Sequence, residues 1–205
     1  MDLIDFPCIF TLINMKILVT GGDGKFAQKL KNENPDLYLT PGKNELNIID
    51  PMSIKNYGSV VSEVDGIILN ANMGAPEPQD WFDDGQVKPF RDMFDFYVVS
   101  TTRLIEQYAP NLKFVIGLTT GMVARKDRIG HSYPYIFGKE LLTNHIFRLS
   151  CQDKYKHIKM FNINPGPMMD DEGYEYHSKL MYDVVHNLEK YEDGELYSIR
   201  GGDKF

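Results

Sequence analysis

The sequence is poor in cysteine and contains no cluster of basic residues. Cys8 and Cys151 are its only cysteines, and they form neither a C-x-x-C pair nor a disulfide framework. This favours a reducing, cytoplasmic environment, although a single bridge stays open. The five histidines show no close ligand spacing, so we expect no metal site. Because the formal net charge is −7 and no run of Lys and Arg occurs, we expect no nucleic-acid partner.

Long apolar runs and internal repeats are absent as well. No segment approaches the roughly 18 apolar residues of a membrane span, so we expect a soluble protein with no membrane partner. Its 205 residues are undivided by any low-complexity linker and suit one buried core. Residues 1–14 carry acidic residues where a signal peptide has basic ones, and MKILVTGG from Met15 leads straight into a strand. We expect a peripheral N-terminal extension at 1–14 and one domain at 15–205.

From Lys16 onward, short apolar runs alternate with longer helix-like segments. This alternation predicts βα units around a parallel sheet. The predicted fold class is α/β, a single-domain, three-layer, doubly wound parallel sheet of about seven strands, Rossmann-like. Strands are expected at 16–20, 37–40, 46–48, 66–70, 113–118, 158–163 and 196–199, and helices near 25–33, 51–62, 89–108, 134–151 and 176–190.

A glycine turn joins the first predicted strand to the first predicted helix, in the stretch KILVTGGDGKFAQKL. Gly21, Gly24 and Ala27 form a G-x-x-G-x-x-A spacing. Glycines let the backbone approach a ligand, and the following helix offers unpaired N–H groups to a pyrophosphate. The turn predicts dinucleotide binding, with a plain tight corner as the alternative. The cofactor-binding residues expected from it are Gly21, Gly22, Asp23, Gly24, Lys25 and Phe26.

The end of the second predicted strand bears on which dinucleotide binds. In LYLTPGKNEL no acid stands where one often holds the adenosine ribose; Thr40 is near that place and Lys43 follows it. A cation without an acid accommodates a 2′-phosphate, so NADP(H) is favoured over NAD(H). The alternative is that Lys43 is a solvated loop lysine.

A second constellation lies in YPYIFGKELL, which places Tyr135 and Lys139 four apart on one helix face. An adjacent ammonium stabilises a phenolate and moves its pKa of about 10 towards the working range of an acid/base catalyst. Upstream, Thr119 and Thr120 end a strand, where a hydroxyl can bind a substrate carbonyl oxygen. Threonines that only form the strand are the alternative.

The order of these motifs resembles that of the short-chain dehydrogenases/reductases, from Met15 to the end of the chain. TGGDGKFA resembles the TGxxGxxG turn, DGIILNAN the DxLVNNAG segment, and VIGLTTG the strand that ends in the catalytic serine. YIFGK matches YxxxK, INPGPM the PG motif that closes over the nicotinamide, and GELYSIRGGD the C-terminal strand.

The resemblance implies a strand order of roughly 3-2-1-4-5-6-7 and hydride transfer between a nicotinamide dinucleotide and a small carbonyl or alcohol substrate. It implies that Tyr135 is the acid/base, that Lys139 binds the nicotinamide ribose and biases Tyr135, and that Thr120 positions the substrate oxygen. The further cofactor-binding residues that it implies are Asn70, Ala71, Asn72, Lys139, Pro165 and Gly166.

The chain also departs from the family. Tyr97 falls near the position of the catalytic asparagine, Gly138 replaces a frequent serine, Asn72 stands where glycine is usual, and the segment after Pro165 is short. Two alternatives stay open. One is a sugar-nucleotide reductase or epimerase, since NELNIIDPMSI resembles a segment of the dTDP-4-dehydrorhamnose reductases; the other is a dinucleotide-binding sensor without turnover. The family's habit of pairing two helices, here near 89–108 and 134–151, implies a homodimer or homotetramer.

Overall fold

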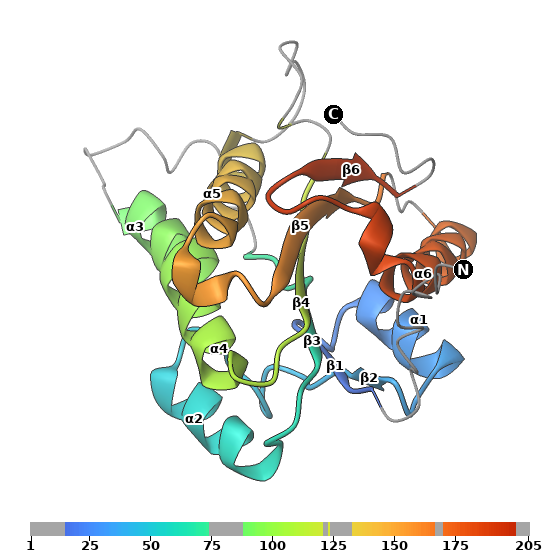
Figure 1. Ribbon diagram of the computed structural model, residues 1–205, viewed down its shortest axis with the longest axis horizontal. Coiled ribbons are helices and arrows are strands. Elements are labelled where there is room, and N and C mark those ends of the chain that lie inside the picture. Colours follow the sequence, from blue (N-terminus) through green and yellow to red (C-terminus); the bar gives the residue numbers. More distant parts are fainter. Residues whose placement is uncertain (1–14, 74–87, 121–122, 124–132, 167–169, 200–205) are drawn as a thin grey trace, which may run out of the picture.

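Six parallel strands form one sheet, which helices cover on both faces in a computed structural model of the chain (Figure 1). The structure describes residues 15–73, 88–120, 123, 133–166 and 170–199, so the predicted extension at 1–14 lies outside the described residues. The strands lie in the order β2-β1-β3-β4-β5-β6, and each pair of neighbours is parallel. Their bounds are β1 (Ile17–Val19), β2 (Tyr38–Leu39), β3 (Gly66–Leu69), β4 (Phe114–Leu118), β5 (Lys159–Asn164) and β6 (Leu196–Ser198).

Two hydrophobic cores lie on opposite faces of the sheet, because successive strand residues point to opposite sides. Leu18 and Ile67 belong to one core, whereas their neighbours Ile17 and Ile68 belong to the other. The first core is covered by α2 (Pro51–Val60), α4 (Thr101–Tyr108) and α5 (Tyr133–Ser150), and the second by α1 (Lys25–Glu33) and α6 (Asp171–His186). The predicted three-layer, doubly wound α/β fold is confirmed.

The strand predicted at 46–48 is wrong, so the sheet has six strands instead of about seven. Leu46 and Ile48 are buried, as the apolar pattern suggests, but the backbone around them forms turns. The N–H of Leu46 donates to the carbonyl of Gly42 over 2.9 Å, and the N–H of Asn47 donates to the Ser53 hydroxyl at the start of α2. These local bonds occupy backbone N–H groups that a strand would use to pair with a neighbouring strand.

The helix predicted at 89–108 is divided into α3 (Lys88–Phe94), the π-helix η3 (Asp95–Ser100) and α4. The Ser100 hydroxyl donates to the carbonyl of Asp95 over 2.8 Å, and the Thr101 hydroxyl donates to that of Tyr97 over 2.6 Å. Side-chain hydroxyls therefore bind carbonyls in the wide turn. Single π-turns inside α-helices are frequent at functional sites, and this one carries Tyr97.

Capping by aspartates sets the start of two helices. Asp50 accepts the N–H of Met52 at the start of α2, and Asp170 accepts that of Gly173 at the start of α6. Helix α6 therefore begins at Asp171, five residues before the predicted 176, because Asp170 caps it and Asp171 and Glu172 are acids that suit a helix N-terminus. Two short 3-10 turns, η5 (Asp153–Tyr155) and η6 (Leu188–Lys190), follow α5 and α6.

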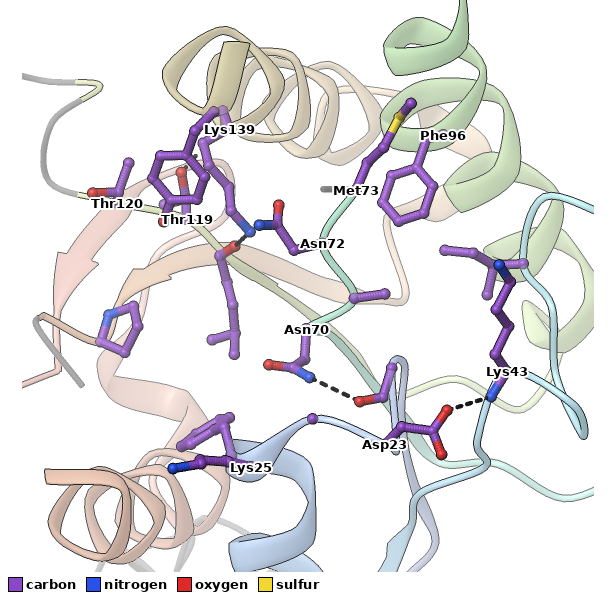
Figure 2. A pocket seen from close by; sticks show the side chains of 18 of the residues that line it. Asp23, Lys25, Lys43, Asn70, Asn72, Met73, Phe96, Thr119, Thr120 and Lys139 are labelled. Carbon is purple, nitrogen blue, oxygen red and sulfur yellow. Dashed lines mark hydrogen bonds between the residues drawn. The ribbon is translucent and has the colours of Figure 1, made fainter. Parts of the chain in front are cut away.

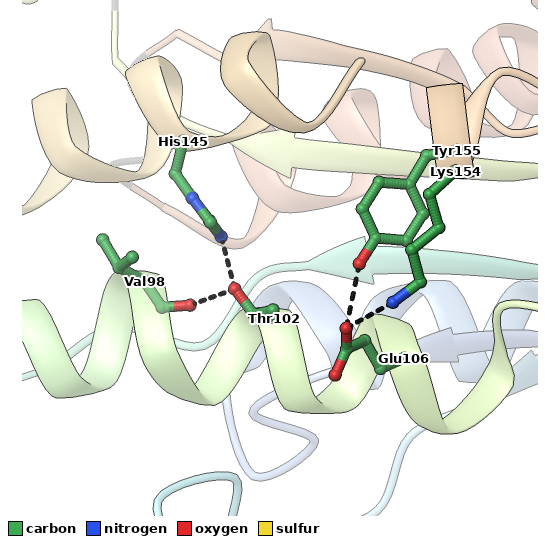
Figure 3. Close-up of polar contacts among 6 residues, drawn as sticks. All are labelled: Val98, Thr102, Glu106, His145, Lys154 and Tyr155. Carbon is green, nitrogen blue, oxygen red and sulfur yellow. Dashed lines mark hydrogen bonds and ion pairs between the residues drawn. The ribbon is translucent and has the colours of Figure 1, made fainter. Parts of the chain in front are cut away.

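Polar contacts join α4 to α5 and to the turn after it (Figure 3). The Thr102 hydroxyl donates to the carbonyl of Val98 and lies 2.8 Å from His145 Nε2. Because that hydroxyl has one proton, His145 is the donor to it. Burial lowers the pKa of His145, which keeps the ring neutral. On the next turn of α4, Glu106 accepts hydrogen bonds from Lys154 and Tyr155.

Candidate active site

One pocket of about 650 Å³ opens at the carboxyl ends of the strands, the edge at which ligands bind in open α/β sheets. In Figure 2, Asp23 and Lys25 lie at one end of it, and Thr119, Thr120 and Lys139 lie at the other. The predicted site residues that line it are Gly21, Asp23, Gly24, Lys25, Phe26, Lys43, Asn70, Ala71, Asn72, Thr120, Tyr135, Lys139, Pro165 and Gly166.

Two predicted cofactor-binding residues, Gly22 and Thr40, are absent from the pocket wall. They contact each other behind it: a side chain on Gly22 would overlap the carbonyl of Thr40 and lie 2.5 Å from that of Pro41. The N–H of Gly22 donates to the Pro41 carbonyl over 3.0 Å. In this structure Gly22 is therefore the glycine that lets the turn pack against the end of β2.

Gly21 and Gly24 form the part of the turn that faces the pocket. Gly21 has a φ of +71°, which side-chain-bearing residues rarely adopt, and a Cβ there would lie 2.9 Å from Ala71 Cα. Gly24 is the N-cap of α1, and its N–H closes the turn on the Gly21 carbonyl over 3.0 Å. The first turn of α1 therefore meets the pocket without a side chain at its cap.

The segment after β3 fixes the position of the glycine turn. The Asn70 amide donates to the carbonyl of Thr20 over 2.9 Å, and the N–H of Ala71 donates to the Thr20 hydroxyl over the same distance. These bonds join two segments fifty residues apart in sequence. The predicted pocket residues Asn70 and Ala71 thus also support the turn.

The structure brings Tyr135, Thr120 and Lys139 together. Burial raises the pKa of Tyr135, and a hydrogen bond with Thr120 offsets part of that rise. Lys139 Nζ lies 5.9 Å from the centre of the Tyr135 ring and donates to the carbonyl of Leu118 over 2.8 Å. Only 4% of Lys139 is exposed, and burial lowers its pKa to about 8.

The expected effect of Lys139 on Tyr135 differs in the structure. The four-residue spacing predicts that the ammonium lowers the pKa of Tyr135, but the net shift is upwards. The reason is geometric: the Lys139 ammonium is bonded to the Leu118 carbonyl, and burial of the phenol outweighs its hydrogen bond with Thr120. Tyr135 is therefore protonated at neutral pH.

The two threonines that end β4 have different surroundings. Thr119 is 3% exposed, and its hydroxyl lies 2.7 Å from that of Thr143 and 3.4 Å from the carbonyl of Lys139. Thr120 is half-buried and bonds Tyr135. Thr119 thus ties β4 to α5, while Thr120 has its hydroxyl beside the phenol.

Asp23 and Lys43 meet near the end of β2. The N–H of Lys43 donates to the Asp23 carboxylate over 2.8 Å, while the Lys43 side chain extends away from it (Figure 2). An acid does stand near the expected ribose position, then, but it comes from the glycine turn. Its place there depends on a tertiary contact that the local sequence does not show.

Several lining residues were not predicted. Tyr174 comes from the first turn of α6, ahead of the predicted start of that helix at 176, whereas Leu46 to Ile49 come from the predicted strand at 46–48 and the residue after it. Phe96 comes from the π-helix, which no local pattern indicates. Met73, Leu118 and Asn164 adjoin motifs that were identified, and Thr119 also lines the pocket, next to the predicted Thr120.

Two negative findings concern only the described ranges. Within them, no three His, Cys, Asp or Glu side chains gather in a way that could hold a metal ion. No helix in the same part of the chain combines the length and apolarity needed to cross a membrane.

Solved structures with the same architecture cover nearly the whole chain, although no protein-family model and no curated protein matches its sequence. A Burkholderia multivorans protein assigned to the short-chain dehydrogenases/reductases, with bound NADP, superposes with a TM-score of 0.73 at 15% identity, covering 93% of this chain and 98% of that one. The NADPH-bound carbonyl reductase from chicken fatty liver gives 0.69 at 16% identity, covering 93% of each chain. A Brucella ovis oxidoreductase of the short-chain dehydrogenase/reductase family, in complex with partially ordered NAD, gives 0.69 at 13%, covering 90% and 99%.

The chain has the short-chain dehydrogenase/reductase fold. The strand order implied by the resemblance to short-chain dehydrogenases/reductases is confirmed once the absent strand at 46–48 is left out.

Proposed function

We propose that the protein is an NAD(P)-dependent oxidoreductase of the short-chain dehydrogenase/reductase type, acting on a small carbonyl or alcohol substrate. One observation carries the proposal: Tyr135, Thr120 and Lys139 share a single pocket with the glycine turn. An acid/base group and a phosphate cradle in one cavity suit a dinucleotide and a substrate held side by side. The NADP, NADPH and NAD bound in structures of this fold are consistent with it.

The residues present fit a dinucleotide. At Gly21 the backbone lies so close to Ala71 that a side chain would clash with it, and Gly24 leaves the N-terminus of α1 without a side chain at its cap. Helix N-termini favour phosphate, and the Lys25 ammonium adds a positive charge at the pocket wall. We assign the pyrophosphate to this turn, the adenosine side to Asn70, Ala71 and Asn72, the nicotinamide ribose to Lys139, and closure over the nicotinamide to Pro165 and Gly166.

The chemistry of the reaction falls to three side chains. When bound, the dinucleotide supplies or accepts a hydride. The Tyr135 hydroxyl gives a proton to the substrate oxygen during reduction and takes it back during oxidation. Thr120 donates a hydrogen bond that holds that oxygen beside the phenol, and Lys139 binds the nicotinamide ribose next to it.

We propose NADP(H) rather than NAD(H), because the Lys43 side chain lines the pocket just beyond β2. The Asp23 carboxylate would repel a 2′-phosphate, because its hydrogen bond with the N–H of Lys43 holds this carboxylate close to Lys43. If the proposal holds, Lys43→Ala raises the KM for NADPH several-fold and leaves that for NADH unchanged, while Asp23→Asn lowers the KM for NADPH. Equal effects of Lys43→Ala on both cofactors would assign Lys43 no part in the choice.

We also propose that the protein forms a homodimer or homotetramer through the outer faces of α3, η3, α4 and α5. Phe94 and Phe147 are 49% and 43% exposed on these elements, an exposure that burial in an interface would remove. Sedimentation velocity at micromolar concentration tests this proposal. A monomer would contradict it without bearing on the chemistry of the pocket.

The proposed reaction is tested by incubating the protein with NADPH and a panel of aldehydes, ketones and sugar nucleotides. Oxidation of NADPH that depends on one of these substrates is the expected result. Tight NADPH binding without turnover of any of them would favour the sensor, and turnover of sugar nucleotides alone would favour the sugar-nucleotide reductase. A failure to bind either NADPH or NADH would refute the proposal.

A further inference from the structure

A buried tyrosine outside the proposed catalytic group packs against it. Tyr97, from the π-helix η3, is 1% exposed, and the centre of its ring lies 5.8 Å from Lys139 Nζ. The Tyr135 ring is at nearly the same distance, 5.9 Å, from that ammonium. Lys139 is therefore in contact range of two phenol rings, of which only Tyr135 belongs to the Y-x-x-x-K pair.

The Tyr97 ring fits where it does because residue 138 has no side chain. A Cβ on Gly138 would overlap the ring edge and lie 3.0 Å from its Cζ. Gly138 is in the interior of α5, where glycine is less favourable than alanine. Two departures from the family pattern, Gly138 and Tyr97, thus fit each other in space.

The Tyr97 hydroxyl holds the turn that follows β3. It donates to Oδ1 of Asn72 and accepts the N–H of Met73 over 3.3 Å. Asn72 and Met73 both line the pocket, and in Figure 2 Asn72 and Lys139 extend into the same part of it. Tyr97 therefore connects η3, α5 and the segment after β3 beside Lys139 and Asn72.

We propose that Tyr97 is a positioning residue of this pocket: its ring, admitted by Gly138, covers one side of Lys139 against water, while its hydroxyl holds the Asn72–Met73 turn in place. The importance of Lys139 to a reaction rests on the proposed function; the packing claim stands separately and is tested without cofactor or turnover.

The pKa of Lys139 is the most direct measure of how far the Tyr97 ring shields its ammonium group from water. Burial lowers its pKa to about 8, so the ammonium loses its proton as pH rises through that value. The titratable groups in range of the ammonium are Tyr135 from α5 and Tyr97 from η3, while β4 presents the Leu118 carbonyl. Burial raises the pKa of Tyr97 to about 12, so this phenol stays neutral while the lysine titrates. Removing the ring admits water and raises the pKa of Lys139.

Carbamoylation of Lys139 by cyanate, followed as a function of pH by peptide mass spectrometry, measures that pKa in the full-length protein. We expect the midpoint of Tyr97→Asn to lie about one pH unit above that of the wild type, because water reaches the ammonium. Tyr97→Phe keeps the ring and therefore the wild-type midpoint. Tyr108→Phe, which alters another buried phenol of the same helical segment, is the matched control. An unchanged midpoint in Tyr97→Asn would overturn the proposal.

Gly138→Ala, made in the wild type and in Tyr97→Asn, tests whether the Tyr97 ring packs against Gly138. It also keeps the proposal testable if Tyr97→Asn alone does not fold. Gly138→Ala in the wild type forces the ring aside, so we expect a lower Tm and a raised Lys139 midpoint. In the Tyr97→Asn background the same change meets no ring, and the better helix propensity of alanine raises the Tm. Gly138→Ala that raises the Tm of the wild type, with its midpoint unchanged, would show that the ring does not occupy this place.

Amide hydrogen exchange tests the hydroxyl. Tyr97→Phe removes the acceptor of the Met73 N–H, so exchange at that amide should quicken by about fivefold, the equivalent of one ordinary hydrogen bond. An unchanged exchange rate at Met73 would show that the Tyr97 hydroxyl does not hold the Asn72–Met73 segment in place. Because neither labelling nor exchange needs NADPH, an inactive wild type would refute the proposed function and leave these results unaffected.

Discussion

A methyl group added at Gly22 and one added at Gly24 should have opposite consequences, although the two glycines belong to one turn. A Cβ at Gly22 would overlap the carbonyl of Thr40 and approach that of Pro41 to 2.5 Å. The turn cannot move aside freely, since hydrogen bonds hold both sides of Gly22. Its N–H donates to the Pro41 carbonyl, and the Gly22 carbonyl accepts a hydrogen bond from the side-chain amide of Gln28. Overpacking of this kind costs about 2 kcal/mol. In a domain of this size, that lowers the Tm by about 4 to 8 °C.

Gly24→Ala causes a milder steric conflict than Gly22→Ala, and we expect it to impair cofactor binding more than stability. Its Cβ would lie 3.2 Å from the Gly21 carbonyl, and its φ of −76° suits alanine, so we expect the Tm to stay within about 2 °C of the wild type. The methyl group would project at the cap of α1, where the pocket is expected to hold phosphate. We therefore expect the Kd for NADPH to rise at least about tenfold, which corresponds to about 1.4 kcal/mol.

Thermal unfolding and NADPH fluorescence titration, carried out on both variants, separate the two roles. The expected pattern is a destabilised Gly22→Ala protein whose folded fraction binds NADPH like the wild type, and a stable Gly24→Ala protein that binds it poorly. Wild-type NADPH affinity in Gly24→Ala would refute the assignment of the pyrophosphate to this turn. An unchanged Tm in Gly22→Ala would refute the packing argument.

Two further predictions concern stability. The neutral His145 ring donates to Thr102, and burial lowers its pKa, so the unfolded state binds a proton more readily. The stability that this contact contributes is therefore complete above about pH 6.5 and is lost as the pH falls below that value and through the lowered pKa of the folded protein. His145→Gln keeps a donor without the titration, so its Tm should fall less steeply with acid; equal slopes would contradict the argument. Asp50→Ala removes the acceptor of the Met52 N–H at the start of α2 and should lower the Tm by about 2 to 4 °C, whereas Asp50→Asn, which keeps an acceptor, should lower it less. A Tm for Asp50→Ala equal to that of the wild type would show that the cap is not needed.

Local chemistry explains which parts of the fold could be predicted from the sequence. The helix at 25–33 was predicted with its observed bounds, because a glycine turn before it marks the start and the apolar spacing marks its length. Helix α6 begins five residues before its predicted start, since the sequence pattern does not distinguish the acidic residues 170–172 in a loop from the cap and first turn of a helix. The prediction of a strand at 46–48 is wrong because buried apolar residues in a turn and in a short strand have the same sequence pattern.

The site shows the same division. Gly21, Gly24, Tyr135 and Lys139 could be found because each lies in a spacing that its chemistry requires, and all four line the pocket. Gly22 shares that motif yet packs behind it, a distinction that depends on the position of β2.

The direction of the Tyr135 pKa could not be predicted either, because it depends on burial and on where the Lys139 ammonium finds its acceptor. Tyr97 could be seen only as a departure from the family. Its contacts come from a π-turn and from a glycine forty-one positions away, and neither is visible along the chain.

The central claim is that Tyr135 moves the proton in a reaction for which this pocket binds the dinucleotide. It is tested most directly by measuring steady-state turnover of NADPH, with the best substrate of the panel, in wild type, Tyr135→Phe and the control Tyr176→Phe, whose ring is exposed. We predict that Tyr135→Phe loses about 10³-fold in kcat, within the range of general acid catalysis, while its Kd for NADPH and the activity of Tyr176→Phe stay at wild-type values. Turnover by Tyr135→Phe at the wild-type rate would contradict the account.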